Sequence, residues 1–412
     1  MDKYLERLKN GTLKLYALEK ELPAPEAIRI RRAFIEEESG VQLPKLGSFT
    51  MDPAAAVTRN IENMVGAVQV PVGVAGPLRV KGEHARGDYY VPLATTEGAL
   101  VASVNRGCGA VTRAGGADVR ILRNGMTRAP VFSARDILHA RAVKDFVEGN
   151  RAALVAAAAE TTSHGELTGA MTFVTGTTVH VRLEFDTKDA MGMNMVTIAS
   201  ERIADLIEER TGARLVALSG NLCTDKKPAA VNGILGRGRT MVAGVKLPGS
   251  LISEVFKTDA RTLVEVNYRK NLVGSARAGA LGYNAHAANV IAALFIACGQ
   301  DAAHVVEGSG TFTTVEEQEG GVYVSVTIPA LQLGTVGGGT GLPTQRECLS
   351  LLGVAGGGTP PGTNAARFAE IAACAVLAGE LSLLGALGAG HLARAHRALG
   401  RGKKDERDLS PG

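Results

Sequence analysis

A short polar loop carries the residues best suited to bind a carboxylate and to stabilise negative charge on oxygen. In the segment SGNLCTDKKPAAVN, Asp225, Lys226 and Lys227 stand together directly before Pro228. An ammonium group is a compact charge that can polarise a carbonyl and offset the charge of a developing oxyanion. A solvated basic turn would have the same residues, so this segment alone leaves both interpretations open.

Two acidic residues elsewhere could exchange protons with such a loop. Glu97, in TTEGALVAS, is expected to begin a helix with Thr96 as its N-cap, among apolar neighbours that would raise its pKa and suit a general acid. A glutamate that only balances a helix dipole is the alternative. Asp301, in ACGQDAAH, follows an apolar helix, where an acid is costly unless paired. Lys226 is its predicted partner, and a surface aspartate is the alternative.

Two histidines lie in the last apolar segment, GELSLLGALGAGHLARAHRALGRG. His391 and His396 are five residues apart, which on a helix turns them about 140° from each other. A single metal site using both is therefore not expected, and no metal site is predicted. One of them could donate a proton near neutral pH while the other is structural.

Two glycine-rich segments suggest close approach of the backbone to a ligand. Gly192, in DAMGMNM, precedes a predicted helix whose N-terminus suits phosphate. The segment GTVGGGTGLPTQRECL, with Gly337–Gly339, enters another helix and suits a nucleotide or a dimer partner. Neither segment matches the GxGxxG fingerprint, so a Rossmann unit is not predicted.

The elements around these motifs predict an α+β protein with an inserted domain. Residues 1–50 read as a helical N-terminal segment, and residues 51–128 and 219–412 as one large helical and mixed domain. Residues 129–218 alternate helices with strands and are expected to form a small α+β sandwich. The apolar stretch IAACAVLAGELSLLGALGAG is interrupted by Glu380, which favours a buried core helix over a membrane span.

Composition excludes several classes of function. The chain has 412 residues, a net charge of +4, 4% aromatic residues and no tryptophan, which gives no basis for a nucleic-acid partner. The five cysteines are dispersed, so disulfides are not expected. The expected location is therefore a reducing cytoplasm. The charged N-terminus is unlike a signal peptide.

Ten segments, in this order, resemble the 3-hydroxy-3-methylglutaryl-CoA (HMG-CoA) reductases, in particular their class I, soluble archaeal-like form. They run from about Ile61 to Arg397, and DKKPAAVN and GTVGGGT are highly specific. The segments are ENMVG with PVGVAGPL, TTEGALVASVNRGCGA, GMTRAPV, DAMGMNM, SGNLCTDKKPAAVNG, NLVGSA, YNAHAANV, ACGQDAAH, LGTVGGGTGLP and GELSLLGALGAGHLARAH.

The resemblance implies a large domain that binds HMG-CoA and a small ferredoxin-like domain that binds NADP(H). It also implies active sites formed between the subunits of a homodimer, or of a higher homo-oligomer. The membrane anchor of the animal and plant members has no counterpart in the sequence, so a soluble, cytoplasmic enzyme with no membrane partner is expected. Its reaction would reduce HMG-CoA to mevalonate and CoA with two NADPH, in the mevalonate pathway of isoprenoid biosynthesis.

Four residues match the family's catalytic positions. Glu97 resembles the acid that protonates the carbonyl, and Lys226 the cation beside the hemithioacetal oxygen. Asp301 would bridge Glu97 and Lys226 and tune their proton affinities. His396 resembles the acid that protonates the departing CoA thiolate, and is chosen over His391 because the family's histidine lies five residues after the GHL histidine.

The resemblance implies two sets of binding residues, one around the substrate and one around the cofactor. The substrate set is Ser103, Arg128, Ser219, Asn221, Asp225, Lys227, Lys270, His286 and Asn289. The cofactor set is Ser163, His164, Asp189, Met191, Gly192, Met193, Asn194, Gly337, Gly338, Gly339 and Arg401, with Arg128 also near it.

The cofactor is expected to be NADPH rather than NADH. GTVGGGT resembles the biosynthetic, NADPH-using class, although Ser163-His164-Gly165 stands where animal members have Ser-Arg-Phe near the 2′-phosphate. The alternative is a degradative, NADH-linked reductase working in the oxidative direction. An acyl-CoA enzyme without redox chemistry would need no nicotinamide, and a non-catalytic binding protein would be expected to lack at least one of the four catalytic residues.

Overall fold

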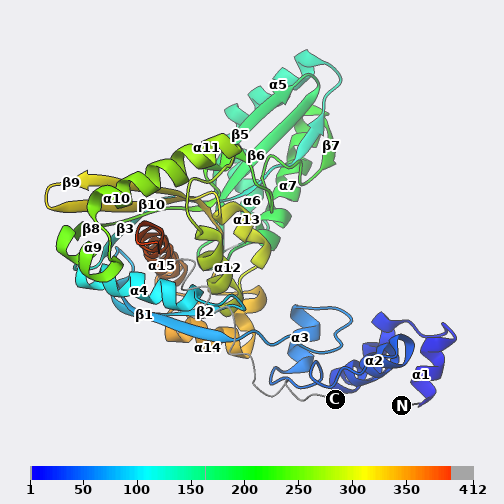
Figure 1. Ribbon diagram of the computed structural model, residues 1–412. Helices are drawn as coiled ribbons and strands as arrows, with labels where there is room; N and C mark the ends of the chain where they lie inside the picture. The colour runs from blue at the N-terminus through cyan, green and yellow to red at the C-terminus, as the bar shows by residue number, and fades with distance from the viewer. Residues whose placement is uncertain (1, 163, 391–412) are drawn as a thin grey trace, which may run out of the picture.

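One strand, β3 (Ala117–Arg128), belongs to two sheets at once and links the two halves of the molecule (Figure 1). In this computed structural model, which describes residues 2–162 and 164–390, residues 118–125 of β3 pair antiparallel with β8 (Gly238–Pro248). Residues 126–128 pair antiparallel with β6 (Thr178–Asp186) of the second sheet. The strand therefore leads directly from the large sheet into the small one.

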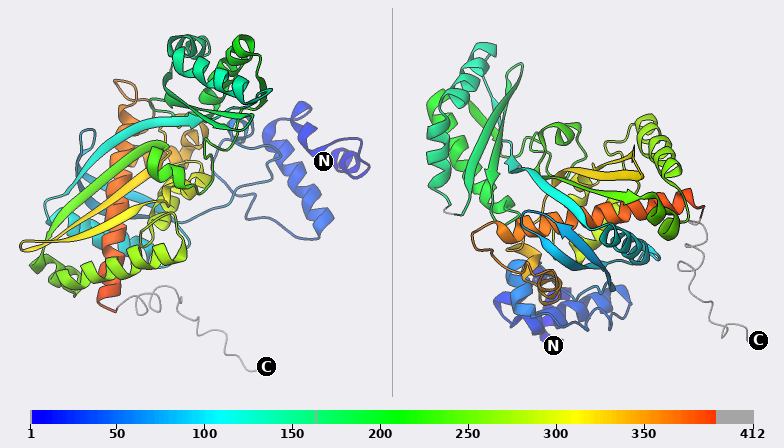
Figure 2. Two further views of the ribbon diagram at one scale, coloured as in Figure 1. Left: turned by 90° about the horizontal axis from the view of Figure 1, so that it is seen from above. Right: turned by 90° about the vertical axis from the view of Figure 1, so that its left-hand side faces the viewer.

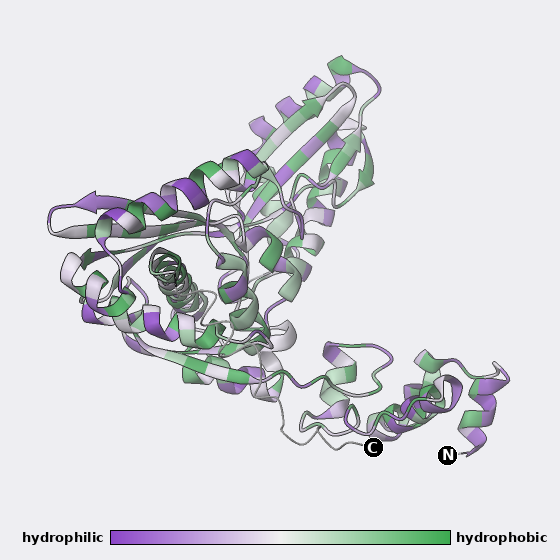
Figure 3. Cartoon of the chain, in the orientation of Figure 1, coloured by the Kyte–Doolittle hydropathy of each residue, from purple (hydrophilic) through white to green (hydrophobic). Residues whose placement is uncertain are grey.

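The larger sheet surrounds a long buried helix. Its strand order is β2 (Arg86–Ala94), β1 (Val72–Lys81), β3, β8, β10 (Gly321–Leu331) and β9 (Phe312–Gln318), with only the short β1–β3 contact parallel. Helix α15 (Thr363–Gly388) packs against this sheet and against α4 (Leu100–Arg113) and α12 (Ala287–Ala297) (Figures 1 and 2). Figure 3 shows α15 almost wholly hydrophobic.

Helix α15 is the one helix in the described part of the chain long and apolar enough to cross a membrane. However, 83% of its most apolar window is buried inside the molecule. Its acidic residue Glu380 is fully buried and accepts hydrogen bonds from the backbone N–H groups of Ala285 and His286 and from the Thr313 hydroxyl, each at 2.7 Å. The predicted buried core helix is confirmed.

The second sheet has the order β7 (Arg214–Ala217), β4 (Val131–Ser133), β6 and β5 (Glu166–Thr175), all antiparallel. Helices α5 (Ile137–Gly149), α6 (Arg151–Ala159) and α7 (Met193–Thr211) cover one face of it (Figure 2). Its hydrophobic core is separate from that of the large sheet. The chain order and strand order are those of a ferredoxin-like unit, as expected, and the α+β class is confirmed.

The N-terminal segment is helical, with α1 (Asp2–Lys9), a 3₁₀ turn (Leu15–Lys20), α2 (Ala24–Ser39) and α3 (Pro53–Arg59). It has small hydrophobic cores of its own and lies to one side of the sheets (Figure 1). The buried Arg31 ties it together by donating to the carbonyl oxygens of Leu15 and Met64. The exact limits of the three domains stay a prediction.

The remaining elements connect these layers. They are α8 (Ala230–Leu235), α9 (Gly249–Phe256), α10 (Ala260–Val266), the π-helix η2 (Asn267–Gly274), α11 (Ser275–Ala278), the 3₁₀ turns η3 (Ala302–His304) and η4 (Gly338–Gly341), α13 (Val305–Gly308) and α14 (Pro343–Leu351).

One predicted helix start is wrong. The helix expected to begin at Glu97 with Thr96 as its N-cap begins instead at Leu100, as α4. Ala99 adopts a left-handed conformation with a φ of 76°, and no side chain caps the helix. Glu97 therefore lies in the turn before the helix rather than in its first turn.

Candidate active site

Lys226 and Asp301 form the centre of the candidate site. Lys226 Nζ lies 2.8 Å from Asp301 Oδ2, which confirms the pairing expected of an acid after the apolar helix α12. Asp301 is the N-cap of η3, where its side chain also accepts from the Ala303 N–H. The hydrogen bond to Asp301 raises the pKa of Lys226. Partial burial alone would raise the pKa of Asp301, but the hydrogen bonds from Lys226 and Ala303 and nearby positive charge outweigh it and lower that pKa.

Hydrogen bonds to Glu307 and Asn232 fix the backbone of the Lys226 loop. Lys226 has a left-handed conformation with a φ of 56°, which is unusual for a residue with a side chain. Its backbone N–H donates to Glu307 Oε1 at 2.7 Å. Thr224, also left-handed, is held by its hydroxyl against Asn232 Oδ1 at 2.5 Å. A buried carboxylate thus sets the turn from which the ammonium group projects.

Arg237 joins the substrate loop to the predicted cofactor segment. Its side chain is fully buried and donates to Asp225 Oδ1 at 3.0 Å and to Glu307 Oε1 at 2.9 Å. It also contacts Met193 Sδ at 3.1 Å. The sequence reasoning missed Arg237, and its only local signal is an arginine between two glycines at the start of β8.

His304 and Glu307 are further buried residues that the sequence reasoning missed. His304 Nε2 lies 3.6 Å from Asp301 Oδ2, and its Nδ1 lies 3.3 Å from Glu307 Oε1. Both residues follow Asp301 at helical spacing, three and six positions later, which is the signal that could have found them. Asp225, His304 and Glu307 have the chemistry of metal ligands. However, Arg237 donates to both carboxylates, which is the arrangement of an ion-pair network.

Glu97 does not lie where the sequence reasoning placed it. In the single chain its side chain is exposed, so the expected burial among apolar neighbours is wrong. Its contact is with Asn289, whose amide nitrogen lies 3.4 Å from Glu97 Oε1. Among the described residues, Asp301 is hydrogen-bonded to Lys226 but not to Glu97, so the expected bridge is present on one side only.

The other substrate-set residues fall into two groups. Lys227 Nζ donates to the Asp225 carbonyl oxygen at 2.9 Å within the Lys226 loop, and Arg128 Nη1, at the end of β3, lies 3.5 Å from Asp225 Oδ2 of the same loop. Ser219 Oγ lies 3.3 Å from Cys223 Sγ on the same loop, which also carries the left-handed Asn221.

The second group lies along the core helix α15 and the π-helix. Ser103 Oγ donates to Ser382 Oγ at 3.1 Å, and His286 Nε2 lies 2.8 Å from the Gly379 carbonyl oxygen. Lys270 is exposed on η2, where Nζ contacts Asn271 Oδ1 at 3.4 Å. Among the residues that the structure describes, this group forms no hydrogen bond with the Lys226 loop.

The two glycine-rich segments predicted for the cofactor lie side by side. Ala190 and Val336 form a parallel bridge, and the Thr335 N–H donates to the Asp189 carbonyl oxygen at 2.8 Å. The Asp189 carboxylate is buried and accepts from the backbone N–H groups of Gly358, Gly362 and Ala365, so it orders the loop before α15. The hydrogen bonds of this carboxylate are to backbone groups, and its place in the cofactor set stays a prediction.

Arg239 also holds together the two glycine-rich segments, and the sequence reasoning missed this residue too. It is buried and donates to the carbonyl oxygens of Leu333 and Lys188 at 3.1 and 2.8 Å. Burial lowers its pKa to about 10, against the opposing charge of Asp186 and Asp189.

The surroundings of Gly192 fit a nucleotide cofactor. Gly192 has a φ of 90° and precedes the first turn of α7, where Met193 and Asn194 leave backbone N–H groups free for an anion. An added Cβ at Gly192 would lie 2.4 Å from Thr187 Cγ2, so no side chain fits there. At Gly337 and Gly338 an added Cβ would meet nothing within 4 Å, which leaves open space above that loop. Met191 packs against the core of the small sheet.

His164 is exposed close to the same helix end. The neighbouring Gly165 lies so near Met195 that an added Cβ would be 2.5 Å from Met195 Cε. Ser163, His391, His396 and Arg401 lie outside the described residues, so their predicted roles stay predictions. All five cysteines are free, as expected.

A ferredoxin-like unit inserted in a larger α+β domain, with a paired lysine at their junction, defines a class of two-domain oxidoreductases. A sequence model of one such family, described as hydroxymethylglutaryl-coenzyme A reductase, matches residues 27–401, and the chain belongs to this family.

Relatives and solved structures agree with this assignment. The chain is 54% identical to the 3-hydroxy-3-methylglutaryl-coenzyme A reductase of Methanothermobacter thermautotrophicus over 97% of this chain and 99% of that protein. It is 54% identical to the reductase of Pyrococcus abyssi over 96% of this chain and 98% of that protein. The class II reductase of Streptococcus pneumoniae, solved bound to NADPH in open conformations, is similar with a TM-score of 0.64, 17% identity, and coverage of 91% of this chain and 100% of that one. That likeness supports the fold.

Proposed function

We propose that the protein reduces HMG-CoA to mevalonate and CoA with two molecules of NADPH. The observation that carries this proposal is the Lys226–Asp301 pair, with Nζ and Oδ2 2.8 Å apart, at the junction with the small sheet. Family membership and relatives with this name over nearly the whole chain support the same reaction. A place in the mevalonate pathway follows from the product.

Lys226 stabilises the charge that each reduction step places on oxygen. The thioester carbonyl, and later the aldehyde carbonyl, becomes an alkoxide, and an ammonium group beside it lowers the energy of that charge. Asp301 keeps Lys226 protonated because its hydrogen bond raises the lysine pKa. Lys226 thus stays protonated until it donates a proton to the substrate oxygen.

Bound NADPH supplies the hydride for each step. Gly192, the N-terminal turn of α7 and the open loop at Gly337–Gly338 would hold it, because they offer free N–H groups and space. His164, beside this helix end, would lie near the 2′-phosphate, and the GTVGGGT segment supports NADPH over NADH. The relatives and the family do not favour the degradative, NADH-linked alternative.

Glu97 and His396 are proposed as the other proton donors. Glu97 would act on the substrate carbonyl, held by Asn289. His396 would protonate the CoA thiolate as it leaves, because a histidine titrates near neutral pH. Ser219, Asn221, Asp225 and Lys227 would position the hydroxymethylglutaryl group, and Arg128 would neutralise charge beside them.

A homodimer is proposed as the functional unit. Glu97 and Lys270 are both exposed in the single chain and, among the described residues, form no hydrogen bond with the Lys226 loop. A second subunit would be needed to bring such residues over one substrate. We also propose that the enzyme is soluble and cytoplasmic and uses no metal.

The proposal is tested by following nicotinamide oxidation with purified protein and HMG-CoA, with NADPH and NADH in parallel. The expected result is substrate-dependent loss of NADPH, two per CoA released, and faster than with NADH. No oxidation with either cofactor by a folded protein would refute the proposed reaction. Oxidation of NADH alone would favour the degradative class instead.

A further inference from the structure

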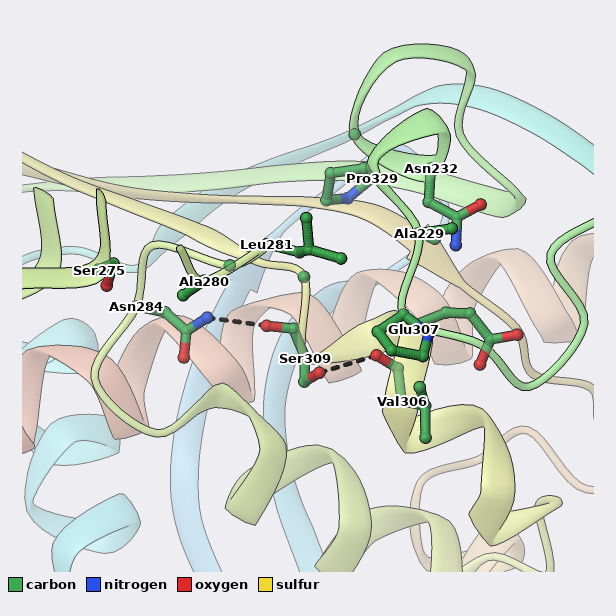
Figure 4. A pocket seen from close by; sticks show the side chains of 15 residues that line it. Ala229, Asn232, Ser275, Ala280, Leu281, Asn284, Val306, Glu307, Ser309 and Pro329 are labelled. Carbon is green, nitrogen blue, oxygen red and sulfur yellow. Dashed lines mark hydrogen bonds between the residues drawn. The ribbon is translucent and has the colours of Figure 1, made fainter. Parts of the chain in front are cut away.

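A cavity, which we call the rear cavity, is lined by Pro228 and Ala229, which directly follow the two loop lysines, and by Glu307, whose Oε1 accepts from the Lys226 N–H. It has a volume of about 390 Å³ and is lined by Asn232, Ser275, Asn284, Glu307 and Ser309, among others. Figure 4 shows the Asn232 amide and the Glu307 carboxylate at the same end of this cavity, away from the hydrogen bond between Asn284 and Ser309. Nothing in the proposed reaction uses this space.

Two buried polar atoms at that end of the cavity are unsatisfied. Asn232 Nδ2 and Glu307 Oε2 have no hydrogen-bond partner among the described residues. Buried polar groups are nearly always hydrogen-bonded, if not to protein then to an ordered water. A cavity of this size holds water easily, and one molecule between the amide and the carboxylate would satisfy both atoms.

His304 connects Glu307 to the catalytic pair. The imidazole is 1% exposed and follows Asp301 by three residues. Its Nε2 lies 3.6 Å from Asp301 Oδ2 and 3.9 Å from Asp225 Oδ1, and has no hydrogen-bond partner among the described residues. At 3.6 Å the contact is longer than a hydrogen bond, but such contacts commonly shorten when substrate binds.

The other ring nitrogen has a partner in either protonation state. Nδ1 lies 3.3 Å from Glu307 Oε1, which can accept its proton, and 3.3 Å from Arg237 Nη1, which can donate to it when that proton is gone. The charged groups facing the ring are the carboxylates of Asp225, Asp301 and Glu307 and the guanidinium of Arg237. The ring is therefore placed to take up a proton on one side and release one on the other.

We propose that Glu307 and His304 form a proton relay that carries protons from the rear cavity to Lys226. The inference rests on the proposed function, in which Lys226 gives up a proton to the substrate oxygen. In the relay, a solvent proton carried by the cavity water protonates Glu307, which passes a proton to His304 Nδ1 while Nε2 passes its own to Asp301 Oδ2, so the ring is never without a proton. Asp301 passes one proton to the neutral amine of Lys226, and Glu307 and Asp301 end as carboxylates.

The relay answers a need of the reaction itself. Reduction of a thioester to an alcohol and a thiol consumes protons as well as hydrides. Substrate bound over Lys226 Nζ covers the front of that group, so a route from behind would restore its proton without substrate release. His304 and Glu307 act through Asp301 and Lys226, and are positioning residues.

The test compares His304→Gln with the wild-type enzyme in the NADPH oxidation assay. We expect kcat to fall by roughly tenfold or more, with the KM for HMG-CoA unchanged and a larger solvent deuterium isotope effect on kcat. In His304→Ala, imidazole added to the assay should restore kcat in a saturable way, because the ring space is then open to it. His139→Gln, which alters a buried histidine on α5 of the small domain, hydrogen-bonded to the Thr211 carbonyl oxygen, should leave kcat unchanged.

A wild-type kcat in His304→Gln would overturn the relay. So would a raised KM without imidazole rescue, because that pattern indicates a structural role. Should both variants fail to fold, a proton inventory on the wild-type enzyme decides: a curved dependence on deuterium content supports a multi-proton relay, and a linear one refutes it. A wild-type protein that oxidises no NADPH would instead refute the proposed function.

Discussion

The ammonium nitrogen of Lys226 lies 2.8 Å from Asp301 Oδ2, although the two residues come from a loop and a helix end 75 positions apart in the chain. Each side chain shifts the proton affinity of the other in the direction that keeps both charged. About half of the Lys226 side chain and a third of Asp301 remain exposed, so the pair is open to a substrate.

Replacing Lys226 with alanine should abolish most of the activity. We expect kcat to fall by roughly 10²–10³-fold, because a preorganised positive charge at a developing oxyanion is lost. The measurement is steady-state NADPH oxidation with HMG-CoA. Lys246→Ala, which removes an exposed lysine from β8, is the matched control and should keep the wild-type rate. An active Lys226→Ala enzyme would contradict the assigned role.

Replacing Asp301 with asparagine should lower stability in a pH-dependent way. Asparagine keeps an oxygen for the Ala303 N–H, so the change removes chiefly the charge. Because the folded-state pKa of Asp301 is lowered, its contribution is present above the ordinary value of about 3.9 and is lost as pH falls through the folded value. The difference from the wild type should be about 0–1 kcal/mol at neutral pH, since the pair is partly exposed.

The pH dependence is checked by urea unfolding of the wild-type and Asp301→Asn proteins from pH 7 down to pH 3. The two stabilities should converge toward the acidic end. At the alkaline end, the raised pKa of Lys226 means that its contribution persists up to about 10.4 and is lost only above it. If the difference in unfolding free energy between the two proteins grows as the pH falls, the pKa of Asp301 is raised on folding, not lowered.

Replacing Glu380 with glutamine should destabilise the large domain. The amide nitrogen of glutamine would replace one carboxylate oxygen and would face at least one of the backbone N–H groups that now donate to it. Leaving such buried donors unsatisfied costs about 1–3 kcal/mol. Chemical denaturation measures the loss, and Glu254→Gln, which breaks a surface ion pair with Arg113, should change stability little. Equal effects of the two changes would contradict the assigned role of Glu380.

Replacing Gly192 with alanine should weaken NADPH binding. The new methyl group would meet Thr187 at 2.4 Å and displace the turn that opens α7. We expect roughly tenfold weaker binding, about 1.4 kcal/mol, by titration of NADPH fluorescence. Gly176→Ala is the control, because Gly176 also has a positive φ but an added Cβ there meets nothing within 4 Å. A variant that binds NADPH as the wild type does would remove this loop from the cofactor site.

The sequence allowed the Lys226–Asp301 pairing to be predicted because an unpaired acid after an apolar helix is costly, and that penalty follows from residue types alone. It also allowed α15 to be predicted as a core helix. The helix start at Glu97 was mispredicted because a plausible cap sequence does not reveal that Ala99 turns left-handed. Whether Glu97 donates a proton stays a prediction.

The spacing of His304 and Glu307 after Asp301 could have placed them near it, but their burial together with Arg237 could not be predicted from the sequence. What buries these charged residues is the contact of segments about 70 positions apart in the chain. Charges of this kind are tolerated only when they meet partners. Those partners become visible only when the chain is folded.

The continuity of β3 has a mechanical consequence. Since one unbroken strand runs through both sheets, the sheets cannot slide past each other, and the softest motion left to them is torsion about that strand. Thr127 and Arg128 lie at the end of β3 that pairs with β6 of the small sheet. There the Thr127 hydroxyl donates to the Cys223 carbonyl oxygen at 2.9 Å, and Arg128 contacts Asp225. A rotation of the small domain on binding its cofactor would therefore be transmitted through β3 to the loop that carries Lys226.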